Sequence, residues 1–281
     1  MRGNRRAAVT VLALLAVVGV AAVVYALATS GSAWTLTWAQ EFNGPSGARL
    51  NPHDWVYDLG GGRWGNGEWQ YYTDRPENVS MDGRGDLAIS AVREQLPGMS
   101  PCPDGPCDIT SARITTKGRF AQTYGLFEAR IKVPPGPGLW PAFWMRGDLP
   151  GQLPWPLSGE IDAMEVFGPY PRSVYGTVHG PGFVYPGLGG HRTLASGALA
   201  DAFHVYGVQW SPDAVTWLLD GRPYYTVRRS ALRAGQTWPF EHRFYLILNL
   251  AVGGTGVGPP TAATPFPARM LVDWVRVYEP S

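Results

Sequence analysis

Three carboxylates lie within six residues in the segment Ser158-Gly-Glu-Ile-Asp-Ala-Met-Glu-Val-Phe-Gly168. Side chains on a β-strand alternate between its two faces, so Glu160 and Asp162 share one face. Plain alternation would place Glu165 on the opposite face. One extra residue, a β-bulge around Ala163-Met164, would return Glu165 to the side of the other two acids. The segment therefore predicts a bulged strand with three acids on one face.

Acids that share one face oppose each other's ionisation, which raises the pKa of at least one of them. The result is a protonated acid beside an ionised carboxylate. Glycoside hydrolysis needs this pair, because one group protonates the leaving oxygen and the other acts as nucleophile or base. The spacing alone leaves two further interpretations open, namely a solvated strand face and a cation site.

Two tryptophans stand just upstream, in the segment Gly138-Leu-Trp-Pro-Ala-Phe-Trp-Met145. Trp140 and Trp144 are an even number of positions apart, so a regular strand puts them on one face. An indole ring suits the apolar face of a sugar and keeps an N–H for a hydroxyl. Two core tryptophans are the alternative, but the neighbouring acids favour a sugar-binding wall.

The composition favours a single β-rich domain. The 281 residues include 36 Gly and 26 Pro, which argues against long helices. Formal net charge is +1 and no basic run follows Arg6, so nucleic acid is excluded as a partner. Many short strand patterns separated by turns predict an all-β sandwich or jelly roll with two antiparallel sheets. The patterns are clearest at 34–38, 87–92, 127–133, 203–210, 215–219, 224–227, 244–252 and 270–278.

Residues 1–33 form a targeting segment. Arg2, Arg5 and Arg6 precede an apolar run from Ala7 to Ala28, which small residues follow. This pattern predicts export, either with a cleaved signal peptide or with a retained N-terminal membrane anchor. We therefore expect a secreted or extracytoplasmic, membrane-anchored protein whose folded domain covers 34–281. Membrane contact would be confined to the N-terminal segment, and the folded domain is expected to be a monomer.

Two cysteines, Cys102 and Cys107, bound a turn-rich hexapeptide. In an oxidising compartment they would close a small disulfide loop, and free thiols are the alternative. A second loop, Gly60–Glu68, is rich in glycine but lacks the Gly-Lys-Ser/Thr ending of a phosphate-binding loop. We interpret that loop as a wall of a cleft.

The combined motifs resemble glycoside hydrolase family 16, and most closely its bacterial laminarinase-type endo-β-1,3-glucanases. The acid motif carries the resemblance together with Trp-Pro-Ala-Phe-Trp upstream and Thr-Val-His-Gly downstream. Similar stretches continue from Trp34 to Tyr278. The resemblance implies a jelly-roll sandwich with a concave substrate cleft and a retaining mechanism that hydrolyses β-1,3-glucan.

The resemblance also implies residue roles. Glu160 would be the nucleophile, Asp162 its electrostatic partner, and Glu165 the general acid and then base. No cofactor would be required for catalysis. A structural calcium would be held by Glu41, the Gly85 carbonyl and Asp273. The sugar subsites would be lined by Trp64, Asn66, Arg113, Trp140, Trp144 and His179.

Two departures from the family pattern concern the cleft. Ala163 stands where the family often has a larger apolar residue, and we expect little effect on the chemistry. The stretch from Gly147 to Pro156 is expected to reshape one end of the cleft. Two alternative functions remain: a mixed-linkage endo-β-1,3(4)-glucanase, and a non-catalytic β-glucan-binding protein. Binding proteins of this kind typically lose one or both glutamates, whereas this chain keeps both.

Overall fold

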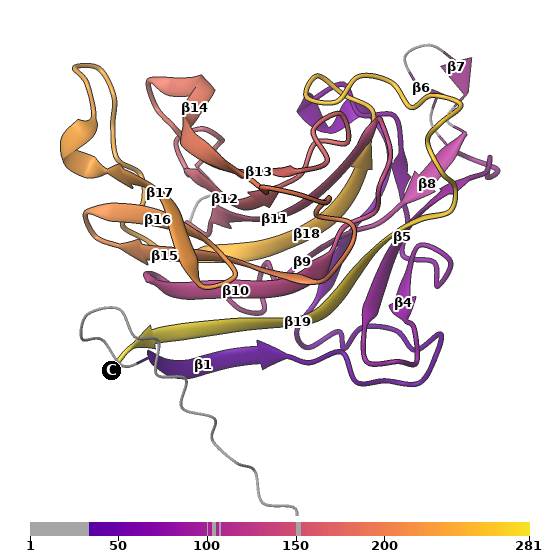
Figure 1. Ribbon diagram of the computed structural model, residues 1–281, viewed down its shortest axis with the longest axis horizontal. Coiled ribbons are helices and arrows are strands. Elements are labelled where there is room, and N and C mark those ends of the chain that lie inside the picture. The colour runs from indigo at the N-terminus through magenta and orange to yellow at the C-terminus, as the bar shows by residue number, and fades with distance from the viewer. Residues whose placement is uncertain (1–33, 100, 103–104, 107, 150–152) are drawn as a thin grey trace, which may run out of the picture.

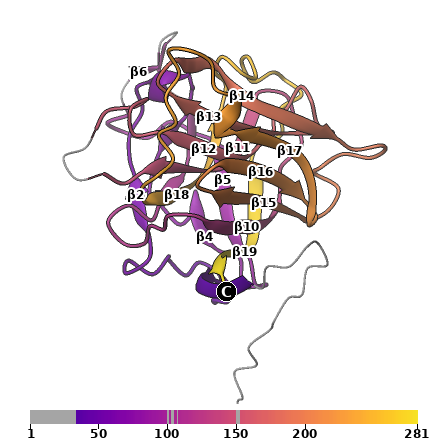
Figure 2. The same ribbon diagram turned by 90° about the vertical axis from the view of Figure 1, so that its left-hand side faces the viewer.

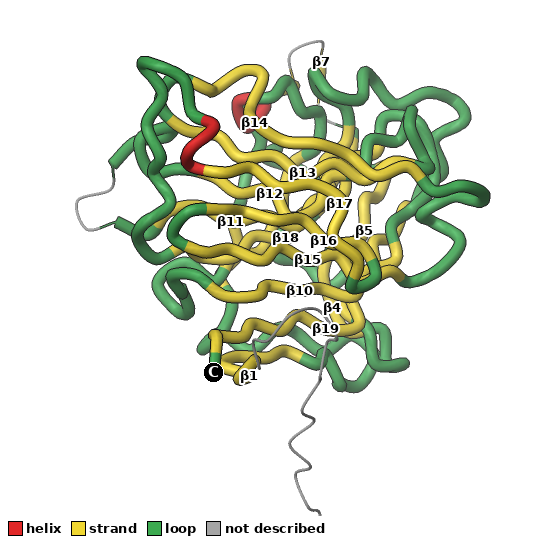
Figure 3. Tube along the Cα trace, turned by 60° about the vertical axis from the view of Figure 1, so that its left-hand side comes forward, coloured by secondary structure: helices red, strands yellow, loops and turns green. Residues whose placement is uncertain are grey.

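The computed structural model describes residues 34–99, 101–102, 105–106, 108–149 and 153–281 (Figure 1). These residues form two large packed β-sheets, a small two-stranded ribbon and two short 3-10 helices, η1 (Arg63–Gly65) and η2 (Arg229–Ala231). Loops join the strands at their ends (Figure 3). The predicted all-β sandwich is therefore confirmed.

The cleft-forming sheet has seven strands, all joined by antiparallel pairing. Their order across the sheet is β14 (Phe183–Thr193), β13 (Ser173–Gly180), β12 (Glu160–Glu165), β11 (Leu139–Gly147), β18 (Phe244–Val252), β9 (Arg113–Thr115) and β2 (Val56–Asp58).

The second sheet, here the outer sheet, packs beneath it (Figures 1 and 2). Within it only β3 and β8 pair in parallel among the described strands. A separate two-stranded ribbon joins β6 (Pro101–Cys102) to β7 (Gly105–Pro106). The main path of the outer sheet runs β17 (Arg222–Arg228), β16 (Ala214–Leu219), β15 (His204–Ser211), β10 (Gly125–Lys132), β19 (Ala268–Pro280), β5 (Leu87–Arg93), β8 (Ile109–Ser111) and β3 (Tyr71–Tyr72); β1 (Trp34–Gln40) pairs with β19 and β4 (Val79–Met81) with β5.

The core lies between the two sheets. All nine residues of β18 are buried, as its continuous apolar sequence predicts for a central strand. On β10 of the outer sheet, Phe127, Ala129 and Ile131 point into the core, and the residues between them are less buried. Each buried Leu, Ile, Val or Phe side chain stabilises the fold by about 1.5–3 kcal/mol. Burial of this alternating face fixes the register of the strands, and hence which side chains reach the outside.

The hairpin predicted at Asp220-Gly221 joins β16 to β17. Both residues have positive φ, 51° and 71°, as a two-residue hairpin turn of type I′ requires. Residues 1–33 and Cys107 lie outside the described residues. The targeting segment and the Cys102–Cys107 disulfide therefore stay predictions. Within the described residues, no helix combines the length and the apolar character needed to cross a bilayer.

Candidate active site

The acidic strand β12 contains the predicted bulge. Against β11, Met164 pairs with Phe143 and Asp162 with Trp144, so Ala163 is the extra residue. The register against β13 shifts over the same interval. Ala163 and Met164 both enter the core, and Glu165 returns to the face of Glu160 and Asp162.

The neighbouring strand β11 has the regular alternation that its tryptophans predict. Phe143 and Met145 are fully buried in the core. Trp140, Ala142 and Trp144 line the opposite side, where Trp140 and Trp144 remain half-buried. The alternative interpretation, that both tryptophans belong to the core, is therefore wrong.

Acids and aromatics together line a cleft on the face of the seven-stranded sheet that points away from the core. One compartment encloses about 420 Å³ and is bounded by Trp64, Arg113, Trp144 and Trp155. The adjoining compartment encloses about 460 Å³, beside β13 and β14. Both compartments share the three acids, which therefore stand at the middle of an elongated groove. The residues common to the two compartments are Asn66, Trp140, Glu160, Asp162, Glu165 and Tyr185.

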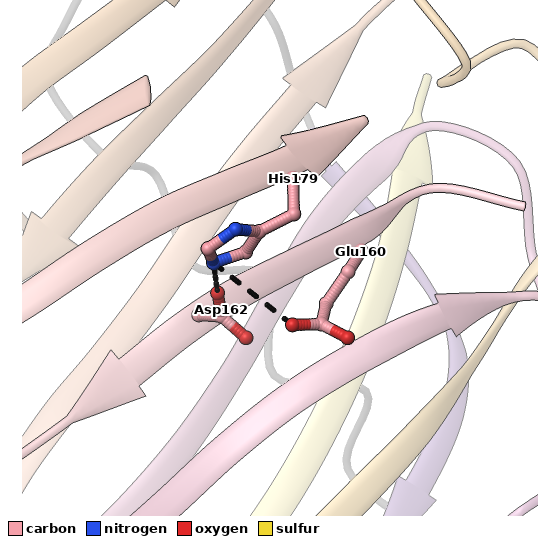
Figure 4. A group of neighbouring side chains, drawn as sticks. All are labelled: Glu160, Asp162 and His179. Carbon is pink, nitrogen blue, oxygen red and sulfur yellow. Dashed lines mark ion pairs between the residues drawn. The ribbon is translucent and has the colours of Figure 1, made fainter. Parts of the chain in front are cut away.

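His179 on β13 organises the charges of the acids (Figure 4). Its Nε2 lies 3.1 Å from Asp162 Oδ2 and 3.9 Å from Glu160 Oε1. Its Nδ1 lies 2.8 Å from the Val184 carbonyl, which makes Nδ1 a donor. Burial alone would lower the pKa of His179, but the hydrogen bond and charge of Asp162, with the charge of Glu160, raise it to about 10. His179 is therefore an imidazolium paired with Asp162 at neutral pH.

Glu160 and Glu165 differ in the groups around them. Burial, and next the charge of Asp162, raises the pKa of both carboxyls. Three positive groups oppose this for Glu160, namely His179, Arg146 and Arg113. For Glu165 the positive charge of His179 and a hydrogen bond from the Trp140 indole N–H, at 2.9 Å, oppose the rise of the pKa, but no arginine among the described residues does, and the charge of Glu160 adds to the rise. Glu160 is thus the better candidate for the ionised carboxylate and Glu165 for the proton donor.

Arg113 on β9 and the loop before β3 complete one wall of the cleft. The Arg113 guanidinium lies 4.8 Å from the ring centroids of both Trp64 and Trp144, and its Nε lies 2.9 Å from Asp58 Oδ2. Trp64 has a positive φ of 47°, which is uncommon for a residue other than glycine and arises here in the tight turn at η1. Asn66 follows in the same loop. All six predicted sugar-binding residues therefore lie around the same cleft.

Sequence reasoning missed Glu68, although it stands two residues after Asn66. The residue is 6% exposed and lines the cleft. Its carboxylate accepts hydrogen bonds from Asn66 Nδ2 at 3.2 Å, Gln70 Nε2 at 2.6 Å and Tyr72 OH at 3.1 Å. Asn249 on β18 continues the chain of hydrogen bonds. Its Nδ2 donates to Tyr72 OH at 3.1 Å, and its Oδ1 accepts from Trp144 Nε1 at 2.7 Å. Glu68 thereby ties the loop to the floor of the cleft.

Two further aromatic residues were also missed, and both precede a proline. The ring centroid of His179 lies 6.4 Å from that of Trp155 and 6.0 Å from that of Tyr185. The centroids of Trp155 and Tyr185 are 5.8 Å apart. Tyr185 is 72% exposed, and the Trp155 Nε1 atom is buried without a hydrogen-bond partner. Trp155 therefore lines one end of the cleft. Residues 150–152 lie outside the described residues, so the reshaping of the cleft by the stretch from Gly147 to Pro156 stays a prediction.

The residues predicted to bind calcium lie on the other side of the molecule. Glu41 accepts hydrogen bonds from Nε and Nη2 of Arg276, at 2.8 and 2.9 Å. Asp273 is paired with Arg130. Both carboxylates are thus already paired with arginines, and calcium binding by Glu41, Gly85 and Asp273 stays a prediction.

The charges at the active site fit an ion-pair cluster better than a metal ion. Among the described residues, Glu160, Asp162 and His179 form a group whose potential ligand atoms lie within 4.8 Å of one another. A histidine must be unprotonated at the ligating nitrogen to bind a metal. The pairing of His179 with Asp162 instead keeps the imidazole protonated, so these residues fit an ion-pair cluster.

Comparison with known proteins agrees with this geometry. Residues 66–276 match the family described as glycosyl hydrolases family 16. The chain belongs to this family. It is 40% identical over 259 residues to a beta-glucanase of Rhodothermus marinus, covering 87% of this chain and 85% of that protein.

Solved structures support the same assignment at the level of the fold. The catalytic domain of an endo-1,3-beta-glucanase (laminarinase) from Thermotoga petrophila has a TM-score of 0.82 and 41% identity, covering 89% of this chain and 100% of that chain. The endo-beta-1,3-glucanase of Pyrococcus furiosus has a TM-score of 0.83 and 42% identity, covering 90% of this chain and 97% of that chain. This family 16 protein therefore has the jelly-roll fold of laminarinases.

Proposed function

We propose that this family 16 glycoside hydrolase is a retaining endo-β-1,3-glucanase. The observation that supports this most directly is the bulged strand β12, which aims Glu160, Asp162 and Glu165 into the middle of one open groove. An acid cluster at the middle of a groove allows a polysaccharide to extend past it on both sides, as internal cleavage requires. The similar proteins from Thermotoga petrophila and Pyrococcus furiosus are named as endo-β-1,3-glucanases.

The proposed reaction has two displacements. Glu160 attacks the anomeric carbon and forms a glycosyl-enzyme ester, while Glu165 transfers its proton to the departing glycosidic oxygen. Glu165, now ionised, then removes a proton from water. That water attacks the anomeric carbon, releases the sugar and restores Glu160. Asp162, held by His179, stays ionised beside Glu160 and is its electrostatic partner through both displacements.

The proposal includes three points beyond the chemistry. No metal is needed for catalysis, since the cleft carries its own acid and nucleophile. The protein acts as a monomer, on the outer side of the membrane, either secreted or held by residues 1–33. Its substrate is a laminarin-like β-1,3-glucan, because the extra residue of the acid motif is typical of the laminarinase-type members that this chain resembles.

A product profile tests the substrate. We expect reducing ends to appear fastest from laminarin and curdlan, more slowly from lichenan, and not from agarose. Equal rates on laminarin and lichenan would favour the mixed-linkage endo-β-1,3(4)-glucanase. Binding of laminarin without any release of reducing ends would instead identify a β-glucan-binding protein.

The anomeric form of the first product tests the mechanism. Proton NMR of the earliest products should show the β-anomer, because two displacements restore the starting configuration. Three acids crowded on one short strand leave little room for the water that an inverting enzyme places between its carboxyls. Initial release of the α-anomer would contradict the nucleophilic role of Glu160.

A further inference from the structure

A second pocket lies on the outer sheet, on the opposite face of the sandwich from the catalytic cleft. It encloses about 230 Å³, a space suited to a single sugar ring. Strand alternation explains its position. On β19, Val275 and Val277 point into the core, so Trp274, Arg276 and Tyr278 point outward. The residues around the pocket are Trp34, Leu126, Glu128, Val205, Asp220, Gly221, Trp274, Arg276 and Tyr278.

A half-buried carboxylate, Glu128 on β10, forms part of this pocket. It pairs in register with Gly207 on β15 and with Arg276 on β19. A Cβ atom at Gly207 would lie 3.2 Å from Glu128 Cγ, so the glycine leaves the room that Glu128 occupies. Burial raises the pKa of Glu128 to about 7, and the charge of Arg276 opposes this rise.

The described side chains give Glu128 no hydrogen-bond or ion-pair partner, because its neighbours are engaged elsewhere. Arg276 donates two hydrogen bonds to Glu41, interacts with the Tyr278 hydroxyl and lies over the Trp274 ring at 4.4 Å. Asp220 accepts a hydrogen bond from the Val205 backbone N–H and forms an ion pair with His204. A half-buried carboxyl that faces a pocket without a protein partner is left for a ligand that has hydrogen-bonding groups.

The chemistry of the pocket selects among ligand classes. Anions are disfavoured by Glu128 and Asp220. Small cations are disfavoured because Arg276 adds a positive charge and Glu128 is the one unpaired carboxylate. A neutral sugar suits these groups, since its hydroxyls can bind Glu128 and its apolar face can pack on the rings of Trp34 and Tyr278, while Trp274, with Arg276 over its ring, forms part of the wall.

We propose that this pocket is a second saccharide site, which binds β-1,3-glucan on the face opposite the catalytic cleft. Its choice of ligand rests on the proposed function, because it assumes that the polymer cleaved in the cleft is also the one held here. A polysaccharide held at two sites dissociates more slowly than one held at either site alone. The site would therefore increase attachment to long or insoluble glucan and leave the cleavage of short chains unchanged.

The test is a calorimetric titration of the full chain carrying Glu160→Gln with a linear β-1,3-linked glucopentaose. Two binding sites per chain are expected, a tighter one in the cleft and a weaker one outside. Trp274→Ala and Glu128→Gln should each weaken the second site at least tenfold and leave the first unchanged. Leu36→Ala removes an exposed side chain of β1 outside the pocket, 51% exposed, and serves as the matched control. Glu128→Gln keeps the size of the side chain, so it tests the site even where Trp274→Ala unfolds the protein.

Laminarin hydrolysis by the unsubstituted protein separates this proposal from the proposed function. If the unsubstituted protein hydrolyses laminarin but the titration finds a single binding site, the outer site is overturned and the proposed function stands. A second site that neither Trp274→Ala nor Glu128→Gln affects would also overturn its placement in this pocket. Absence of hydrolysis, with an outer site still sensitive to Trp274→Ala, would overturn the proposed function and leave the pocket in place.

Discussion

Two neighbouring strands of the cleft, β11 and β12, direct their side chains by different rules. On β11 the alternation is regular, so every second residue from Trp140 to Arg146 lines the cleft. On β12 one extra residue places Ala163 and Met164 together in the core, and Glu165 returns to the cleft. The two strands show that, where strand pairing is regular, the spacing of residues along the sequence predicts which face of the sheet each side chain occupies. An odd spacing between functional residues that must share one face indicates a bulge.

The largest difference between the two strands is expected when one residue is deleted from each of them. Without Ala142, alternation on β11 would turn either the cleft tryptophans or Phe143 to the wrong face. Large core side chains contribute about 3–5 kcal/mol each, so several such losses approach a total stability of about 5–15 kcal/mol. We expect the protein lacking Ala142 not to fold.

Deleting Ala163 from β12 should have a smaller effect, because the remaining order Glu-Ile-Asp-Met-Glu alternates and keeps all three acids on the cleft face. We expect a folded protein whose laminarin hydrolysis falls about 10²-fold, the scale of a small misplacement of catalytic groups. Circular dichroism melting and reducing-sugar release measure the two effects. Equal loss of folding in both deletion variants would show that β12 needs its bulge, and that correct alternation of side chains between the two faces is not sufficient.

Glu160→Gln and Glu165→Gln sharpen the comparison within β12. Each should lower hydrolysis by at least about 10²–10⁴-fold, the scale of a lost acid–base group, with the fold intact. An aryl glycoside with a good leaving group needs no proton from the enzyme, so it should restore part of the activity of Glu165→Gln alone. An identical response of both variants to the activated substrate would contradict the assigned roles.

Trp140→Ala examines β11 at a residue that lines the cleft. Trp140 is half-buried, so we expect its loss to weaken oligosaccharide binding more than it lowers the free energy of unfolding. The fully buried Trp217, whose Nε1 donates to the Asp162 carbonyl at 2.7 Å, is the matched control. Trp217→Ala should cost about 3–5 kcal/mol. Titration with laminarioligosaccharide and urea unfolding measure both quantities, and an equal cost for the two variants would place Trp140 in the core.

The smallest expected effect concerns the Asp162–His179 pair, a charge interaction that β11 lacks. The folded-state pKa of His179 is raised to about 10 from an ordinary value of 6.5. Between these two pH values the folded state therefore binds more protons than the unfolded state. The stabilisation that the protonated His179 contributes to the fold is complete below pH 6.5 and is lost as pH rises to about 10.

The melting temperature of the unsubstituted protein should therefore fall more steeply across pH 6.5–10 than that of His179→Asn. His53→Asn, at an exposed position, should leave the slope unchanged and serves as the control. Parallel slopes for all three proteins would show that His179 is not held as an imidazolium.

The amino-acid sequence alone determined the strands, the acid face and the aromatic wall. These features follow from local alternation and from residue chemistry, and they need no knowledge of which strands become neighbours. The bulge was also predictable, because an odd spacing between Glu160 and Glu165 cannot otherwise place both acids on one face.

Tertiary structure alone decided the contacts that join distant strands. Arg113 lies between Trp64 and Trp144, and Glu68 reaches Trp144 through Tyr72 and Asn249. The outer pocket likewise combines residues of four strands, β1, β10, β15 and β19, with a hairpin turn. Such contacts depend on sheet order and register, which burial of the whole core fixes and no short stretch of sequence contains.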